Sequence, residues 1–182
     1  MHQGFIRATL LGLSLSLFTL PSSAGDNKPG IYNSAEGFVT AAFGEQPPSA
    51  KTVWLAGELK QQVSDILGHN YPSLRLRYWQ NGDQSAWVLE EIGKEKPITV
   101  GFLVSNQGIE SVEVLAFRES RGWEVKYPFF TDQFRGVRIT DDAKLDQSID
   151  GITGATLSVR ALTKLARMAL LLHQHVLDKD AA

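Results

Sequence analysis

The spacing of apolar residues divides the chain into helical and extended stretches. Residues 34–43 and about 50–67 carry apolar side chains at helical spacing, and Gly68 follows the second stretch as a typical helix end. Alternating apolar and polar positions then predict strands at residues 74–78, 85–89, 98–104 and 109–117. Because the connections between these strands are short, we expect antiparallel neighbours in a meander.

A long helix is predicted from Thr156 to about Leu177. Its apolar residues recur three or four positions apart, as in a buried stripe: Leu162, Leu165, Ala169, Leu172 and Val176. Residues 119–136, before it, are aromatic and turn-rich without a clear period. The order of elements predicts an α+β domain, in which an antiparallel meander sheet packs with N-terminal helices and this C-terminal helix.

The first 24 residues have the pattern of a secretory signal peptide. Arg7 precedes an almost uninterrupted apolar run at 8–20, and Ser22 and Ala24 occupy the small-residue positions of a cleavage site. A membrane-spanning helix needs about 20 apolar residues, so the run is short for an anchor. We expect cleavage after Ala24 and a periplasmic or otherwise exported domain at 25–182; an uncleaved anchor is the alternative.

Composition removes several classes of function. The chain has no cysteine, which excludes disulfides, a lipoprotein anchor and an iron–sulfur cluster. Without Arg7 the chain has 17 basic and 20 acidic residues, a formal charge of −3, so it offers no electrostatic footprint for nucleic acid.

Titratable residues do not form a recognisable catalytic or metal-binding pattern. His173 and His175 are two positions apart on a predicted helix and point in different directions, and His69 follows a helix-ending glycine. The acidic pairs at 90–91 and 141–142 are expected in exposed turns or at edges. We therefore assign no metal ligand and no catalytic residue.

The segment that begins at Asp150 and runs through Gly-Ile-Thr-Gly-Ala to Thr156 combines small residues with the start of a helix. Unpaired amides and the positive end of the dipole make a helix N-terminus a natural phosphate site. The hydroxyls of Thr153, Thr156 and Ser158 are candidates to hydrogen-bond to a phosphate or to be esterified by it. The same residue types also cap helices that bind nothing, so the residues alone leave both interpretations open.

The pattern is neither a P-loop nor a dinucleotide fingerprint, but Asp-x-x-Thr-Gly-Ala-Thr resembles the flavinylation motif of the FMN-binding domain family. That family includes the periplasm-facing subunits of the sodium-translocating NADH:quinone reductase and of the Rnf complex. Its last motif threonine carries FMN through a phosphoester, which a flavin transferase installs from FAD. The resemblance implies that Thr156 is the attachment residue, that Asp150 is the motif acid, and that Thr153, Gly154 and Ala155 shape the turn.

Two further stretches bear on the resemblance. Residues 130–136 are similar to a Gln-Phe-x-Gly stretch that precedes the motif in the family, while residues 119–124 lie where the complex subunits have His-x-Glu-Thr-Pro-Gly. The histidine and proline of that pattern are absent here, which favours a stand-alone exported member over a complex subunit. Trp123 and Tyr127 are the aromatic residues that we expect first against the flavin, although ordinary core packing is favoured for each residue taken singly.

The resemblance implies that residues 25–182 are an FMN-binding domain with covalent FMN, an extracytoplasmic flavoprotein that transfers electrons between redox partners. Expected partners are a flavin transferase for maturation and a membrane reductase or multihaem cytochrome for electron transfer. An electron carrier or redox subunit is favoured over a self-sufficient enzyme. The alternatives are a flavin-dependent reductase with its own substrate and a non-redox module that binds FMN or another phosphate ligand without a bond.

Overall fold

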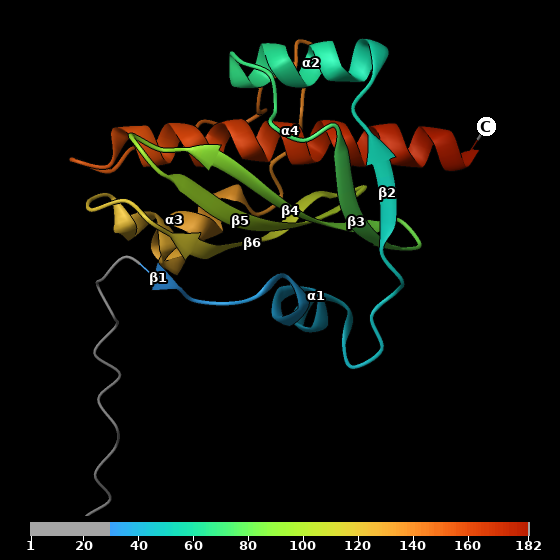
Figure 1. Cartoon of the computed structure of the whole chain (residues 1–182), viewed down its shortest axis with the longest axis horizontal. Helices are drawn as coiled ribbons and strands as arrows, with labels where there is room; N and C mark the ends of the chain where they lie inside the picture. Colours follow the sequence, from blue (N-terminus) through green and yellow to red (C-terminus); the bar gives the residue numbers. More distant parts are fainter. Residues whose placement is uncertain (1–29, 182) are drawn as a thin grey trace, which may run out of the picture.

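A six-stranded antiparallel sheet forms the centre of the molecule (Figure 1). The computed structural model describes residues 30–181, so the predicted signal peptide lies outside the described residues. The strand order is β1-β6-β5-β4-β3-β2, and the run from β3 to β6 is the predicted meander. The strands are β1 (Gly30–Ile31), β2 (Lys51–Trp54), β3 (Arg75–Asn81), β4 (Gln84–Ile92), β5 (Pro97–Ser105) and β6 (Gly108–Phe117).

Helices cover both faces of this sheet and confirm the α+β class. In Figure 1, α4 (Thr156–Ala181) lies across one face with α2 (Gly57–Leu67) on its far side, while α1 (Ala35–Phe43) lies against the opposite face. Three short turns of helix follow β6: η1 (Trp123–Lys126), α3 (Pro128–Thr131) and η2 (Asp132–Phe134). Within residues 30–181 no helix is both long and apolar enough to span a membrane.

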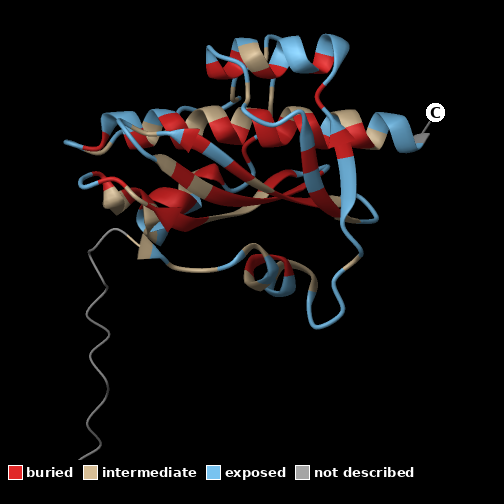
Figure 2. Cartoon of the chain, in the orientation of Figure 1, coloured by how far each residue is buried: buried red, intermediate tan, exposed pale blue. Residues whose placement is uncertain are grey.

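Each face of the sheet has its own hydrophobic core. The larger core lies between the sheet and the α2–α4 pair (Figure 2). Trp87, Phe102 and Leu165 are fully buried there. Burial of each such side chain contributes about 1.5–3 kcal/mol. The smaller core lies under α1, where the ring of Phe38 approaches Gly101 so closely that a Cβ atom there would lie 2.8 Å from it. A glycine in β5 therefore allows α1 to pack directly on the sheet.

The predicted helix at 50–67 is wrong in its first part. Residues Lys51–Trp54 form β2, which pairs antiparallel with β3, and only Gly57–Leu67 is helical. Val53 and Leu55 are buried while Trp54 between them is exposed, which is the alternation of a strand. Gly68 ends α2 in the left-handed conformation as predicted, and its N–H donates to Ser64 O at 2.7 Å.

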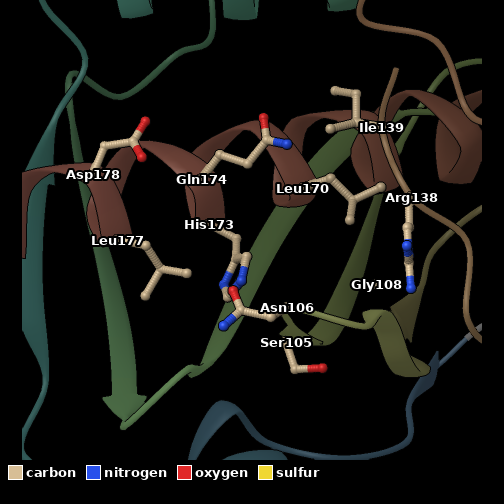
Figure 3. Close-up of a pocket in the computed structure, with 10 residues that line it drawn as sticks. All are labelled: Ser105, Asn106, Gly108, Arg138, Ile139, Leu170, His173, Gln174, Leu177 and Asp178. Atoms are coloured by element: carbon tan, nitrogen blue, oxygen red, sulfur yellow. The ribbon is translucent and has the colours of Figure 1, made fainter. Parts of the chain in front are cut away.

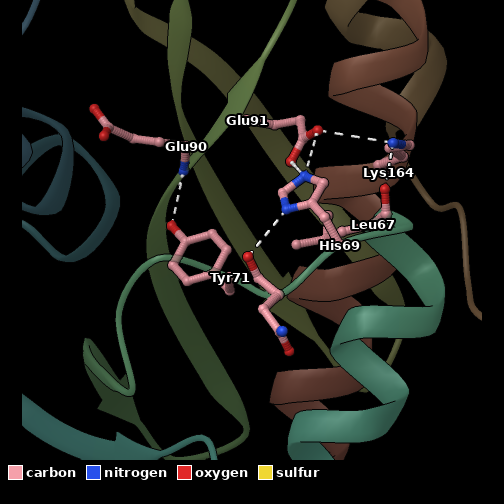
Figure 4. A network of polar contacts seen from close by, with 7 residues as sticks. Leu67, His69, Tyr71, Glu90, Glu91 and Lys164 are labelled. Carbon is pink, nitrogen blue, oxygen red and sulfur yellow. Dashed lines mark hydrogen bonds and ion pairs between the residues drawn. The ribbon is translucent and has the colours of Figure 1, made fainter.

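The acidic pair at 90–91 is also placed differently from the prediction. Glu90 is exposed, but Glu91 is only 6% exposed and lies between side chains from two other segments (Figure 4). His69 Nε2 is 3.0 Å from both of its carboxylate oxygens, and Lys164 Nζ is 3.7 Å from Oε1. Lys164 also donates to the carbonyl oxygen of Leu67 at the end of α2. Glu91 thus connects β4, the segment after α2 and α4.

Candidate functional site

The turn before α4 has a defined hydrogen-bond pattern. The N–H of Ala155 donates to Ile152 O at 2.9 Å, which closes a four-residue turn. Gly154, its third residue, has φ +85°, the left-handed conformation that this position requires in a type II turn. The N–H of Val159 then donates to Ala155 O at 3.0 Å, so Ala155 occupies the N-cap position and Thr156 is the first helical residue.

Thr156 is therefore not the helix cap that the residues alone left open. Its side chain is exposed, and within residues 30–181 its hydroxyl makes no hydrogen bond. In the same part of the chain, the backbone N–H groups of residues 156–158 donate to no protein acceptor, as expected for the first turn of a helix. Donor amides and a hydroxyl consequently face outward together at the start of α4.

This turn forms one wall of a cavity of about 540 Å³, a volume typical of small-molecule and cofactor sites. Two other segments complete it: the β4–β5 loop and the turn that follows β6. Its charged residues are a lysine, an arginine and one buried glutamate. The lining residues are Lys94, Glu119, Ser120, Arg121, Gly154, Ala155, Thr156, Leu157 and Ser158.

Glu119 organises the β4–β5 loop from inside this cavity wall. Its Oε1 accepts three successive backbone N–H groups, from Lys94 at 2.5 Å, Glu95 at 2.6 Å and Lys96 at 2.9 Å. Burial of the carboxylate by itself would raise the pKa of Glu119, but the three amides and the charge of Lys94 outweigh it and lower that pKa. Glu119 is consequently ionised at neutral pH and binds the loop as an anion.

Gly122 brings the turn after β6 against the first turn of α4. It has φ +84°, and a Cβ atom at this position would lie 2.5 Å from Ser158 Oγ and 3.4 Å from the Cα and Cβ of Ala155. The two walls therefore touch at a point where only glycine fits. Ser158 is buried by this contact, while Thr156, two residues earlier, stays exposed.

The Gln-Phe-Arg-Gly stretch at 133–136 supports the motif from the other side. The side chain of Gln133 accepts the backbone N–H of Asp150 at 2.7 Å. Phe134 is fully buried, and the N–H of Gly136 donates to Ile109 O in β6 at 2.7 Å. The stretch thus connects the sheet with the first residue of the motif.

The structure separates the predicted site residues into two groups. Gly154, Ala155, Thr156 and Ser158 line the cavity, whereas Asp150 and Thr153 are exposed and do not line it. Trp123 and Tyr127 lie outside the lining as well. Their rings meet edge to face at a centroid distance of 5.8 Å, and the half-buried Trp123 packs against the larger core.

Five lining residues were not among the predicted site residues: Lys94, Glu119, Ser120, Arg121 and Leu157. Lys94 is the farthest of them from the motif in sequence. The signal for it was indirect: in a meander, the loop before β5 must meet the chain after β6, because β5 and β6 are antiparallel. Ile98 pairs with Phe117, which brings residues 93–97 beside residues 118–122. The two charged segments of the cavity follow from this register.

A second cavity, of about 410 Å³, lies farther along α4 (Figure 3). His173 lines it, and this buried side chain has its Nδ1 2.7 Å from Ser85 Oγ, which in turn accepts the indole N–H of Trp87 at 2.7 Å. Burial lowers the pKa of His173. In the described part of the chain no three or more histidine or acidic side chains gather to hold a metal ion.

Comparison with protein families identifies the domain that contains the motif. Residues 93–171 match the family model described as FMN-binding domain. These residues are an FMN-binding domain. The FMN-binding domain begins at the β4–β5 loop and ends within α4, so it includes all three segments of the cavity beside Thr156. No curated protein and no solved structure matches the chain.

The cavity of the FMN-binding domain suits its cofactor chemically. A phosphate monoester requires donors and positive charge, which the amides of residues 156–158 and the side chains of Lys94 and Arg121 provide. Leu157, 40% exposed on the same wall, adds apolar surface for a flavin ring. The protein binds flavin, and FMN is the cofactor that these residues fit.

Proposed function

We propose that this protein carries FMN covalently on Thr156 through a phosphoester and transfers electrons between redox partners outside the cytoplasm. The observation that carries the proposal is the position of Thr156. It is the last residue of the Asp-x-x-Thr-Gly-Ala-Thr motif, and its hydroxyl is exposed on the cavity of an FMN-binding domain.

Attachment requires no base from this chain. Thr156 Oγ forms a bond to the flavin-side phosphorus of FAD, the bridging P–O bond of FAD breaks, AMP leaves, and the hydroxyl proton passes to solvent. A flavin transferase supplies the catalysis, for which Thr156 has only to be accessible. The amides of α4 and the helix dipole then stabilise the phosphodiester charge.

FMN supplies the redox chemistry when bound, and the chain's residues hold it and set its surroundings. The ester bond suits an exported protein, because a dissociated flavin would be lost where no cytoplasmic flavin pool replaces it. Export rests on the signal-peptide pattern of residues 1–24. A membrane reductase or a multihaem cytochrome is the class of partner that an exposed, one-domain carrier would meet.

Co-expression with a flavin transferase tests the attachment. We expect the wild-type protein to keep flavin fluorescence in a denaturing gel and to gain the mass of an FMN ester. Thr156→Ala should lose both, whereas Thr52→Ala, a change at an exposed threonine of β2, should keep them. Fluorescence that persists in Thr156→Ala would rule out this attachment residue.

The same samples separate the alternatives. Flavin that copurifies with the wild-type protein but is fully released on denaturation would indicate a non-covalent module. Turnover of small electron acceptors by the purified holoprotein without a partner would indicate a reductase with its own substrate.

A further inference from the structure

We infer that Glu119 is a positioning residue that holds the ammonium group of Lys94 at the FMN cavity, where this cation favours the reduced state of the flavin. The inference rests on the part of the proposed function that places FMN in the cavity beside Thr156. In this inference Lys94 stabilises the negative charge of the reduced flavin, and Glu119 positions Lys94.

The first step is the way in which the loop is held. The carboxylate of Glu119 accepts N–H groups from three successive residues of a four-residue connection. The loop also approaches it without room to spare, since a Cβ atom at Gly93 would lie 2.9 Å from Glu119 Oε1. One buried anion thus fixes the backbone on both sides of the Lys94 side chain.

The second step is that no side-chain contact competes for this role. Lys94 Nζ lies 3.4 Å from Glu95 Oε1, but the two side chains are 70% and 69% exposed. An ion pair with such exposure contributes about 0–1 kcal/mol and holds neither partner in place. The loop backbone therefore sets where the Lys94 side chain begins, and Glu119 holds that backbone.

The third step concerns the charges that a flavin meets. Lys94 and Arg121 both line the cavity, and they come from the two segments that Glu119 joins. The carboxylate of Glu119 interacts with Lys94 as well as with three loop amides and offsets part of this charge, but the lining keeps two cations against one anion. A flavin gains negative charge on reduction, and a nearby cation stabilises that charge more strongly in a partly enclosed site than in water.

The midpoint potential of the bound FMN tests the role of Lys94. Lys94→Gln should shift the potential to a lower value, and Lys94→Arg should keep it close to that of the wild type. The matched control is Lys96→Gln, a change in the same loop at a side chain that does not line the cavity. An unchanged potential in a Lys94→Gln protein that carries full flavin would overturn the inference.

A double-mutant cycle tests whether Glu119 acts through Lys94. Glu119→Ala removes a negative charge as well as the anchor of the loop, so its direct effect is measured in the Lys94→Gln background. We expect the shift in midpoint potential caused by Glu119→Ala to be more negative when Lys94 is present than in the Lys94→Gln background. Equal shifts in both backgrounds would show that Glu119 does not position Lys94.

Amide hydrogen exchange of the flavin-free protein gives an independent readout. Exchange at residues 94–96 should accelerate in Glu119→Ala and stay unchanged in Lys94→Gln. Glu119→Gln serves as the milder variant if the alanine variant does not fold. Unchanged exchange would contradict the anchoring step even if no flavin is attached, so failure of this inference and failure of flavinylation give different results.

Discussion

Glu91 and Glu119 are both buried carboxylates, one close to the end of β4 and one just after β6, yet they have different roles. Glu91 contacts the side chains of His69 and Lys164, which come from other elements, and thereby connects α2, β4 and α4. Glu119 contacts the backbone of a single loop. The partners of Glu91 are side chains that can carry positive charge, and the contact occupies them inside the fold. The hydrogen-bond partners of Glu119 are backbone amides, which leaves the side chains of Lys94 and Arg121 accessible from the cavity.

The largest effect expected from this difference is a loss of stability at Glu91. Glu91→Ala removes the shared partner of His69 and Lys164, and hydrogen bonds to charged groups contribute about 1.5–3 kcal/mol. We expect the free energy of unfolding to fall by about that amount in urea denaturation. The matched control Glu90→Ala, at an exposed position of the same strand, should cost less than about 1 kcal/mol. Equal losses would show that burial of Glu91 is unimportant.

The corresponding change at Glu119 should cost less stability. The amides that lose their acceptor in Glu119→Ala belong to Lys94, Glu95 and Lys96, which are exposed and can bind water instead. We expect the free energy of unfolding to fall by about 1 kcal/mol, at the low end of the cost of an unmet hydrogen bond. If the free energy of unfolding fell as far as in Glu91→Ala, measured in the same urea series, Glu119 would stabilise the fold in the same way as Glu91.

The smallest effect expected is a difference in pH dependence. The Asn70 carbonyl and the Glu91 carboxylate raise the pKa of His69 against a smaller opposing effect of burial. The contribution of His69 to the free energy of unfolding is therefore complete below pH 6.5 and disappears as pH rises through the folded-state pKa. The lowered pKa of Glu119 acts in the opposite direction. Its contribution is present above 4.5 and disappears as pH falls through the folded-state pKa.

Urea denaturation across this pH range measures both contributions. His69→Gln should remove the dependence on the basic side, by less than about 1 kcal/mol because His69 is partly exposed. Glu119→Gln should remove part of the dependence on the acidic side. If His69→Gln changed the pH dependence on the acidic side, or Glu119→Gln changed it on the basic side, the two carboxylate sites would not be independent.

The sequence predicted the elements whose pattern is local. The meander from β3 to β6 and the long α4 depend on runs of alternating or helical spacing, and both are present. β2 was missed because Val53 and Trp54 also fit the helical spacing of the apolar residues that continue into α2. β1 has two residues and exists only through its pairing with β6, which no local pattern reveals.

The site divides in the same way. Gly154, Ala155, Thr156 and Ser158 are neighbours in sequence, and the motif placed them together. Lys94 joins them only because β5 pairs with β6 in one register, and that register contains an irregularity between Thr99 and Val100. Residues that meet through a sheet register cannot be read from spacing along the chain, and the burial of Glu91 between α2 and α4 is a second example.

The position of α4 in the chain has a consequence for the order of folding. All six strands of the sheet precede it, so the larger core cannot be completed during synthesis until residues after 156 are available. The helix start that forms the cavity wall beside Thr156 exists only once α4 has docked on that face. We therefore expect the cavity beside Thr156 to be complete only at the end of folding.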